Sequence, residues 1–192
     1  MPSTFFRRAT LTLLGMGLAL SGASSRADDA RLAACADIQA PPELLASESK
    51  GALCDYFEDA RAIMIVNTAS MCGYTGQFSG LQELHQTYGP RGLRLLGFPS
   101  DDFGGQEHAK ADKTAEVCFK NFGVSFPMFS QVDVRGDTAH PLFRKLASAS
   151  NSAPRWNFHK YLVTAEGVQG FASSVAPQDA QLRRAIEASL QK

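Results

Sequence analysis

Cys72 is the residue of this sequence whose type and position are best suited to chemistry. It follows a short apolar run, 63–66, typical of a buried strand, and precedes residues 77–88, whose apolar side chains recur at helical spacing. In an open α/β sheet, reactive groups gather where strands end and helices begin. Backbone N–H groups and the helix dipole at such a place favour the thiolate. Lowering the thiol pKa from about 8.5 to about 6 requires roughly 3.4 kcal/mol and makes the thiolate dominant at pH 7.

The neighbours of Cys72 limit what a thiolate at this position would attack. The residue three places on is Thr75, so the segment lacks the Cys-x-x-Cys pair of a disulfide exchanger. A hydroperoxide fits better, because a thiolate cleaves its weak O–O bond and becomes a sulfenic acid. An inert, buried cysteine is the alternative, and position alone does not separate the two.

The hydrophobic pattern predicts the elements that would position this cysteine. The expected strands are 63–66, 93–98, 128–134 and a hairpin of 158–163 with 168–171. The expected helices are 77–88, one with Asp112 as its N-cap that carries Cys118, 140–146 with Pro141 in its first turn, and 177–190. This order predicts an α/β protein with a thioredoxin-like fold, in which helices flank a central mixed sheet.

The composition excludes several classes of protein. A chain of 192 residues that is 44% hydrophobic supports one domain with a real core, and not a disordered or collagen-like chain. Its 19 Lys and Arg residues balance 19 Asp and Glu residues, so no basic excess indicates a nucleic-acid partner.

Residues 1–27 are predicted to be a secretory signal peptide. Two arginines precede an apolar run, 9–23, and the small residues Ser25 and Ala27 suit a cleavage site. The run is shorter than the ~20 residues of a membrane-spanning helix, which favours cleavage over a membrane anchor. We therefore expect residues 28–192 to form a single domain that is exported, in a bacterium to the periplasm, where disulfides persist.

Four segments carry a family resemblance. They are NTASMCGYT at 67–75, LGFPSDDFGGQE at 96–107, FPMF at 126–129 and WNF at 156–158. In order and spacing these segments resemble the signatures of the glutathione peroxidase family. The similarity runs from about Gly51 to the C-terminus and implies a thioredoxin-like fold and a thiol-dependent peroxidase.

The resemblance also implies the catalytic residues. Cys72 stands where the family has its peroxidatic residue, and Gln106, Trp156 and Asn157 match the side chains that accompany it. Amide and indole N–H groups are neutral donors, which would stabilise a thiolate and then the charge on the departing oxygen.

By the same resemblance, Cys118 is the resolving cysteine that forms a disulfide with Cys72 from the sulfenic acid, and we hypothesise that its helix partly unwinds to do so. A buried helical cysteine without a role is the alternative. Ser100-Asp101-Asp102 stands where the family usually has Cys-Asn-Gln, which leaves Cys118 as the favoured resolver. These two acids would oppose thiolate formation unless they point to solvent. Cys35 and Cys54 then become candidates for a structural disulfide.

The function expected from the sequence is an exported peroxidase that reduces hydrogen peroxide and organic hydroperoxides under oxidative stress, without haem, flavin or metal. The electron donor is glutathione or a thioredoxin-like dithiol protein, and a resolving cysteine favours the dithiol. We expect a monomer, with no nucleic-acid partner and no stable membrane insertion. Two alternatives remain open: an exported thioredoxin-like disulfide reductase, and a non-catalytic peroxide sensor.

Overall fold

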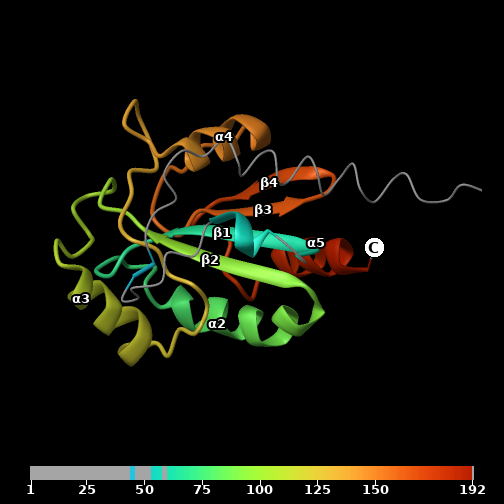
Figure 1. Cartoon of the computed structure of the whole chain (residues 1–192), viewed down its shortest axis with the longest axis horizontal. Coiled ribbons are helices and arrows are strands. Elements are labelled where there is room, and N and C mark those ends of the chain that lie inside the picture. Colours follow the sequence, from blue (N-terminus) through green and yellow to red (C-terminus); the bar gives the residue numbers. More distant parts are fainter. Residues whose placement is uncertain (1–43, 46–52, 58–59, 192) are drawn as a thin grey trace, which may run out of the picture.

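The computed structural model describes residues 44–45, 53–57 and 60–191. At its centre lies a four-stranded sheet in the order β2-β1-β3-β4 (Figure 1). β1 (Ala62–Thr68) pairs in parallel with β2 (Leu93–Pro99) and antiparallel with β3 (Lys160–Thr164), which pairs antiparallel with β4 (Gly167–Phe171). The sheet is therefore mixed, as the sequence predicted.

Helices cover both faces of the sheet. They are α2 (Gln77–Tyr88), α3 (Ala111–Ala115), which continues as the π-helix η3 (Glu116–Asn121), α4 (Pro141–Ser150) and α5 (Ala180–Leu190); η1 (Leu53–Tyr56) and η2 (Gly89–Arg91) are short 3₁₀ turns. Figure 1 shows α4 on one side of the sheet and α2 on the other. The apolar residues of α5 belong to the same cluster as those of α2.

The continuous apolar run of β1 is explained by this arrangement. Met64 and Val66 pack into the cluster under α2 and α5, whereas Ile63 and Ile65 pack into the cluster under α4. Successive side chains of a strand point to opposite faces, so a strand buried on both sides is apolar throughout.

The predicted third strand, 128–134, is wrong. Met128 and Phe129 form only isolated bridges, and Val132 N donates to the carbonyl of Pro99, the last residue of β2. At the end of this segment the side chain of Asp102 takes the place of a strand partner, because its Oδ2 accepts from Val134 N at 2.6 Å and from Arg135 N at 3.1 Å.

Three helix boundaries also differ from the prediction. α4 ends at Ser150 and not at 146. Asp112 is not an N-cap, since α3 begins at Ala111 after Lys110, and Asp112 Oδ1 accepts only from the N–H of Lys113. α5 begins at Ala180, later than the expected 177, and Asp179 caps it through Gln181 N. Helix 77–88 and the position of Pro141 are confirmed.

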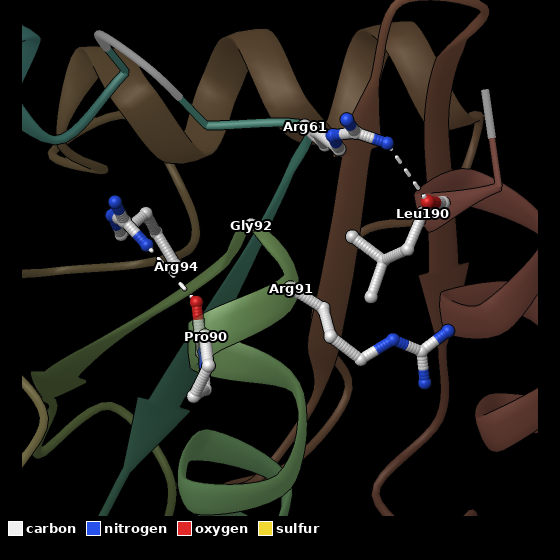
Figure 2. A pocket seen from close by; sticks show the side chains of 7 residues that line it. Arg61, Pro90, Arg91, Gly92, Arg94 and Leu190 are labelled. Atoms are coloured by element: carbon white, nitrogen blue, oxygen red, sulfur yellow. Dashed lines mark hydrogen bonds between the residues drawn. The ribbon is translucent and has the colours of Figure 1, made fainter.

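The end of the sheet remote from Cys72 is rich in arginine. Figure 2 shows Arg61, Arg91 and Arg94 around a surface pocket of about 500 Å³ between the turn before β2 and the end of α5. Arg61 Nη1 donates to Leu190 O at 3.1 Å, which satisfies a terminal carbonyl of α5 and ties that helix to the start of β1.

Two expectations lie outside the described residues. The signal peptide at 1–27 and Cys35 are not described, nor is the side chain of Cys54, so the Cys35–Cys54 disulfide stays a prediction. Among the helices that are described, none has the length and apolar character needed to cross a membrane.

Candidate active site

The strand topology brings three loops to one end of the sheet. The loop after β1 carries Cys72, and the loop after the parallel strand β2 carries Gln106. Because β3 runs antiparallel to β1, the residues just before β3, Trp156 and Asn157, lie at the same end. This is the edge at which an α/β sheet collects its functional side chains.

Cys72 lies in a tight turn between β1 and α2 and is only 8% exposed. α2 begins at Gln77, so the cysteine lies between strand and helix, as the sequence predicted, but before the first helical turn. A local backbone donor acts on the sulfur instead, since Tyr74 N lies 3.4 Å from Cys72 Sγ.

Thr75 holds this turn together. Its Oγ1 accepts from Cys72 N at 3.0 Å and lies within donating distance of Ala69 O, at 2.9 Å, and of Cys72 O, at 2.7 Å. In the sequence, Thr75 was notable only because it stands where a disulfide exchanger has its second cysteine. In the structure its hydroxyl fixes the backbone on which the sulfur sits.

Gln106 is tied to the nucleophile turn through its backbone. Met71 N donates to Gln106 O at 2.9 Å, immediately before Cys72 in the chain. The loop turns at Gly104, whose φ of +77° is a left-handed conformation that favours glycine. A Cβ at Gly104 would lie 3.8 Å from Gln106 Nε2 and 3.9 Å from the Trp156 ring, so these two side chains flank the same backbone.

Asn157 contacts Gln106 directly. Its side chain is fully buried, and Nδ2 donates to Gln106 Oε1 at 3.2 Å. That bond uses the acceptor end of the Gln106 amide and leaves its N–H groups available to another partner. The structure thus joins Gln106 and Asn157 as one unit beside the turn that carries Cys72.

Trp156 lies at the surface of this unit, with 40% of it exposed. Its ring packs against Phe103 at a centroid distance of 5.8 Å, and the Arg135 guanidinium lies 4.8 Å from the Phe103 ring centre. Asn67, near the end of β1, donates from Nδ2 to Trp156 O at 3.2 Å. An exposed indole whose ring packs on Phe103 and whose carbonyl is bonded by Asn67 is poorly explained as a core residue and suits a role at a site.

The backbone between Asn157 and β3 is strained. Phe158 has a φ of +64°, which is unusual for a bulky residue and costs on the order of 1–3 kcal/mol. Its N–H donates to Asn67 O at 2.6 Å, and its carbonyl accepts from Lys160 Nζ at 2.7 Å. Lys160 Nζ also donates to Val175 O at 2.8 Å. Asn67 and Lys160 therefore hold the conformation that presents Trp156 and Asn157.

The pH dependence of stability tests whether the ammonium group of Lys160 is buried. Burial lowers the pKa of Lys160 to about 7. Between pH 7 and about 10.4 the unfolded chain binds this proton and the folded chain largely does not, so stability rises with pH in that window. From pH 6.5 to 9.5, the free energy of unfolding of the wild type should rise by about 3 kcal/mol relative to Lys160→Met. Chemical denaturation at both pH values measures this difference.

The exposed Lys120 supplies the control for that experiment. Lys120→Met should follow the wild type at both pH values. If Lys160→Met also runs parallel to the wild type, the ammonium of Lys160 is not destabilised by burial.

Three large apolar side chains are exposed in the described part of the chain: Met71 at 52%, Tyr74 at 37% and Trp156 at 40%. Two of them flank Cys72 in sequence, and the third belongs to the unit just described. A pocket of about 350 Å³ lies beside them, lined by Tyr74, Arg155, Trp156, Ala172, Ser173 and Ser174. Cys72 does not line this pocket, but the exposed Met71 and Tyr74 make the surface on either side of the cysteine partly apolar.

The carboxylates of Asp101 and Asp102 accept hydrogen bonds from backbone N–H groups. Asp101 Oδ1 accepts from Glu107 N at 2.9 Å, and Asp102 Oδ2 accepts from Val134 N and Arg135 N. Both side chains thus bind the loop backbone on residues 107, 134 and 135.

Cys118 is fully buried in η3 and belongs to the same apolar cluster as Cys72. Burial, with a smaller contribution from the Glu107 charge, raises the pKa of Cys118 to about 12. A protonated, enclosed thiol is a poor nucleophile, so the helix must open before Cys118 reacts. Cys118 lies on a helix, as expected, although this helix is of the π type, which often occurs at functional sites.

The structure thus brings together Gln106, Trp156 and Asn157 beside the Cys72 turn. Sequence reasoning missed Asn67, Lys160 and Glu107, which hold these segments in place. Asn67 and Glu107 stood inside the resembling segments, and Lys160 is a charged residue at the start of an otherwise apolar strand. These two features of the sequence could have drawn attention to the three supporting residues.

The fold and the site define a thioredoxin-like protein with one cysteine at the end of its central strand. The family model for glutathione peroxidase matches residues 46–147. Glutathione peroxidase homolog BsaA of Staphylococcus aureus strain MW2 is 46% identical over 131 residues, which cover 65% of this chain and 82% of that protein. The glutathione peroxidase-like peroxiredoxin GPX5 of Chlamydomonas reinhardtii is 45% identical over 125 residues, 62% of this chain and 77% of that protein.

One more relative and two solved structures are also similar to this chain. The hydroperoxy fatty acid reductase gpx1 of Synechocystis is 39% identical over 133 residues, 63% of this chain and 79% of that protein. The crystal structure of Trgpx in its apo form superposes with a TM-score of 0.59 at 25% identity, covering 79% of this chain and 92% of that one. A thioredoxin-family thiol:disulfide interchange protein of Chlorobium tepidum, at 14% identity and a TM-score of 0.51 over 79% of this chain and 99% of that one, shows the fold alone.

The chain belongs to the glutathione peroxidase family. It is a peroxidase, and the expectation of a thioredoxin-like fold is confirmed.

Proposed function

We propose that the protein is an exported thiol peroxidase in which Cys72 reduces hydrogen peroxide and organic hydroperoxides. The observation that carries this proposal is the joined pair Gln106–Asn157, bonded to the turn that holds Cys72. Neutral N–H donors beside a sulfur suit a reaction in which negative charge passes from sulfur to a departing oxygen.

The first step transfers one oxygen. The Cys72 thiolate attacks the terminal peroxide oxygen, the O–O bond breaks, and the alkoxide or hydroxide takes a proton and leaves as alcohol or water. The sulfur is oxidised to a sulfenic acid and the peroxide is reduced by two electrons. Gln106, Trp156 and Asn157 are the side chains proposed to donate to the sulfur and to the leaving oxygen.

The second step restores the thiol through Cys118. The Cys118 sulfur attacks the sulfenic sulfur, an S–S bond forms and water leaves. A dithiol protein then reduces the Cys72–Cys118 disulfide, giving two thiols and its own disulfide. The buried state of Cys118 supports a helix-opening step before this attack.

The substrate class follows from the surroundings of the cysteine. The exposed side chains of Met71, Tyr74 and Trp156 suit the apolar part of an organic hydroperoxide. The name of the Synechocystis relative, a hydroperoxy fatty acid reductase, agrees with such a substrate. We also propose that the protein is exported through residues 1–27 and acts against oxidative stress in the periplasm.

Peroxide consumption with two reductants tests the function. The purified protein should turn over hydrogen peroxide and an organic hydroperoxide with a thioredoxin-type dithiol protein, and more slowly with glutathione. Reduction of insulin by the protein would favour a disulfide reductase instead. Oxidation of Cys72 without multiple turnover by either reductant would favour a peroxide sensor.

Cys118→Ser separates the two chemical steps. The variant should reduce one equivalent of peroxide at the wild-type rate, form no internal disulfide, and lose at least about tenfold in turnover with the dithiol protein. Mass spectrometry of peroxide-treated protein follows the Cys72–Cys118 peptide. Cys118→Ala, which buries no hydroxyl, should behave in the same way, and wild-type turnover in both variants would exclude Cys118 as the resolver.

A further inference from the structure

Glu107 has an unusual environment for a buried acid. Only 5% of it is exposed, and its two carboxylate oxygens accept four hydrogen bonds. The donors are Ser70 N at 3.1 Å, Ser70 Oγ at 2.5 Å, His108 N at 2.7 Å and Thr114 Oγ1 at 2.8 Å. All four donors are neutral; three of them contact Oε1 and one contacts Oε2.

These bonds link the two cysteine-bearing segments. Ser70 lies in the loop that leads into Cys72, and Thr114 lies on α3, about one helical turn before Cys118. Asp101 Oδ1 in turn holds the Glu107 N–H at 2.9 Å, which fixes the loop that carries the acid. One side chain therefore joins the nucleophile loop to the helix of the second cysteine.

The helix itself supplies the reason for such a link. α3 has only five residues, and it continues as the six-residue π-helix η3, a rare form that occurs mostly as single turns. Thr114 is its buried polar contact, with 2% of the residue exposed, whereas the Lys113–Glu116 ion pair lies on its solvent side. Much of the polar anchoring of this helix to the body of the protein thus passes through Glu107.

We propose that Glu107 is a positioning residue that keeps the Cys118 helix folded against the nucleophile loop, and that its hydrogen bond from Thr114 breaks when the helix opens for the resolving step. This inference rests on the proposed function, in which Cys118–SH and Cys72–SOH combine into a disulfide and water. The contact with Ser70 remains during this opening, so peroxide reduction at Cys72 is unaffected.

Thr114→Val tests the proposal without removing the acid. Valine keeps the shape of threonine and deletes only the donor, so the helix should open about tenfold more readily. After mixing with peroxide, acid quenching and alkylation, the disulfide should form about tenfold faster than in the wild type. The fluorescence of Trp156, the single tryptophan of the sequence, monitors the preceding oxidation step, whose rate should not change.

Two further variants sharpen the result. Thr114→Ser restores the donor and should restore the wild-type rate. Lys113→Ala removes an exposed ion pair from the same helix without touching Glu107, so it should change neither step. Equal rates of disulfide formation in Thr114→Val and Lys113→Ala would overturn the proposal.

A readout without peroxide separates this inference from the proposed function. In the reduced protein, N-ethylmaleimide should label Cys118 about tenfold faster in Thr114→Val than in the wild type or in Lys113→Ala, as measured by peptide mass. If labelling follows this pattern but no Cys72–Cys118 disulfide forms, the resolving step is wrong and the positioning role of Glu107 stands. Unchanged labelling overturns that role whatever the disulfide does.

Discussion

Cys72→Ser is expected to lower the rate of peroxide consumption by about a thousandfold or more. A serine hydroxyl does not ionise near neutral pH and is a weak nucleophile without a general base beside it. The substitution is nearly isosteric and keeps an acceptor for Tyr74 N, so the fold should be preserved. Peroxide consumption with a dithiol protein and with glutathione measures the loss, and thermal unfolding verifies the fold.

A chemical probe completes this experiment. A sulfenic-acid reagent such as dimedone should label Cys72 in the peroxide-treated Cys118→Ser protein and give no adduct in Cys72→Ser. Consumption by Cys72→Ser within tenfold of the wild type would show that another group performs the chemistry, and the assignment of the nucleophile would be wrong.

Asn157→Asp is expected to lower the rate by about a hundredfold. Its Nδ2 donates to Gln106 Oε1 at 3.2 Å in a fully buried position, and the substitution puts an oxygen in its place. If the Gln106 amide turns to donate to the new carboxylate, its N–H is withdrawn from the reaction. If the amide stays, two oxygens face each other. Loss of one preorganised donor costs about 10²–10³ in rate.

The exposed Gln169 on β4 offers a matched control. Gln169→Glu also converts an amide to a carboxylate, without burial, and should leave activity unchanged. Because a buried carboxylate also destabilises the fold, rates are compared well below the unfolding temperature of each variant. An Asn157→Asp protein that is folded and retains activity within threefold would remove Asn157 from the site.

Much of the sheet and its helices could be predicted from the sequence, because local patterns determine them. The run 63–66 is apolar throughout since β1 is buried on both faces, and helix 77–88 shows the spacing of its packed side. The segment 128–134 has equally suitable residues, yet Asp102 binds its backbone from another loop. Because that contact joins residues far apart in the chain, the pattern within 128–134 could not predict it.

The same distinction holds for the site. The side chains at 72, 106, 156 and 157 could be proposed from the sequence because the segments around them resemble the signatures of the glutathione peroxidase family. Their supports could not, because Asn67, Glu107 and Lys160 act on residues that only the fold brings close. Thr75 could be read as a missing cysteine, but its bonds within the turn depend on backbone geometry.

Asn67 connects the segment that carries Trp156 and Asn157 to a strand that resists local unfolding. It lies on β1, an interior strand of the sheet, and contacts residues 156, 158 and 159 through its side chain and backbone. Interior strands exchange their amide protons last, whereas short helices of irregular hydrogen bonding open early. In the proposed mechanism, the reaction with peroxide therefore depends on residues held by an interior strand, whereas recovery of the thiol depends on a short helix. Local opening of that helix would expose Cys118 while the contacts of Asn67 stay in place.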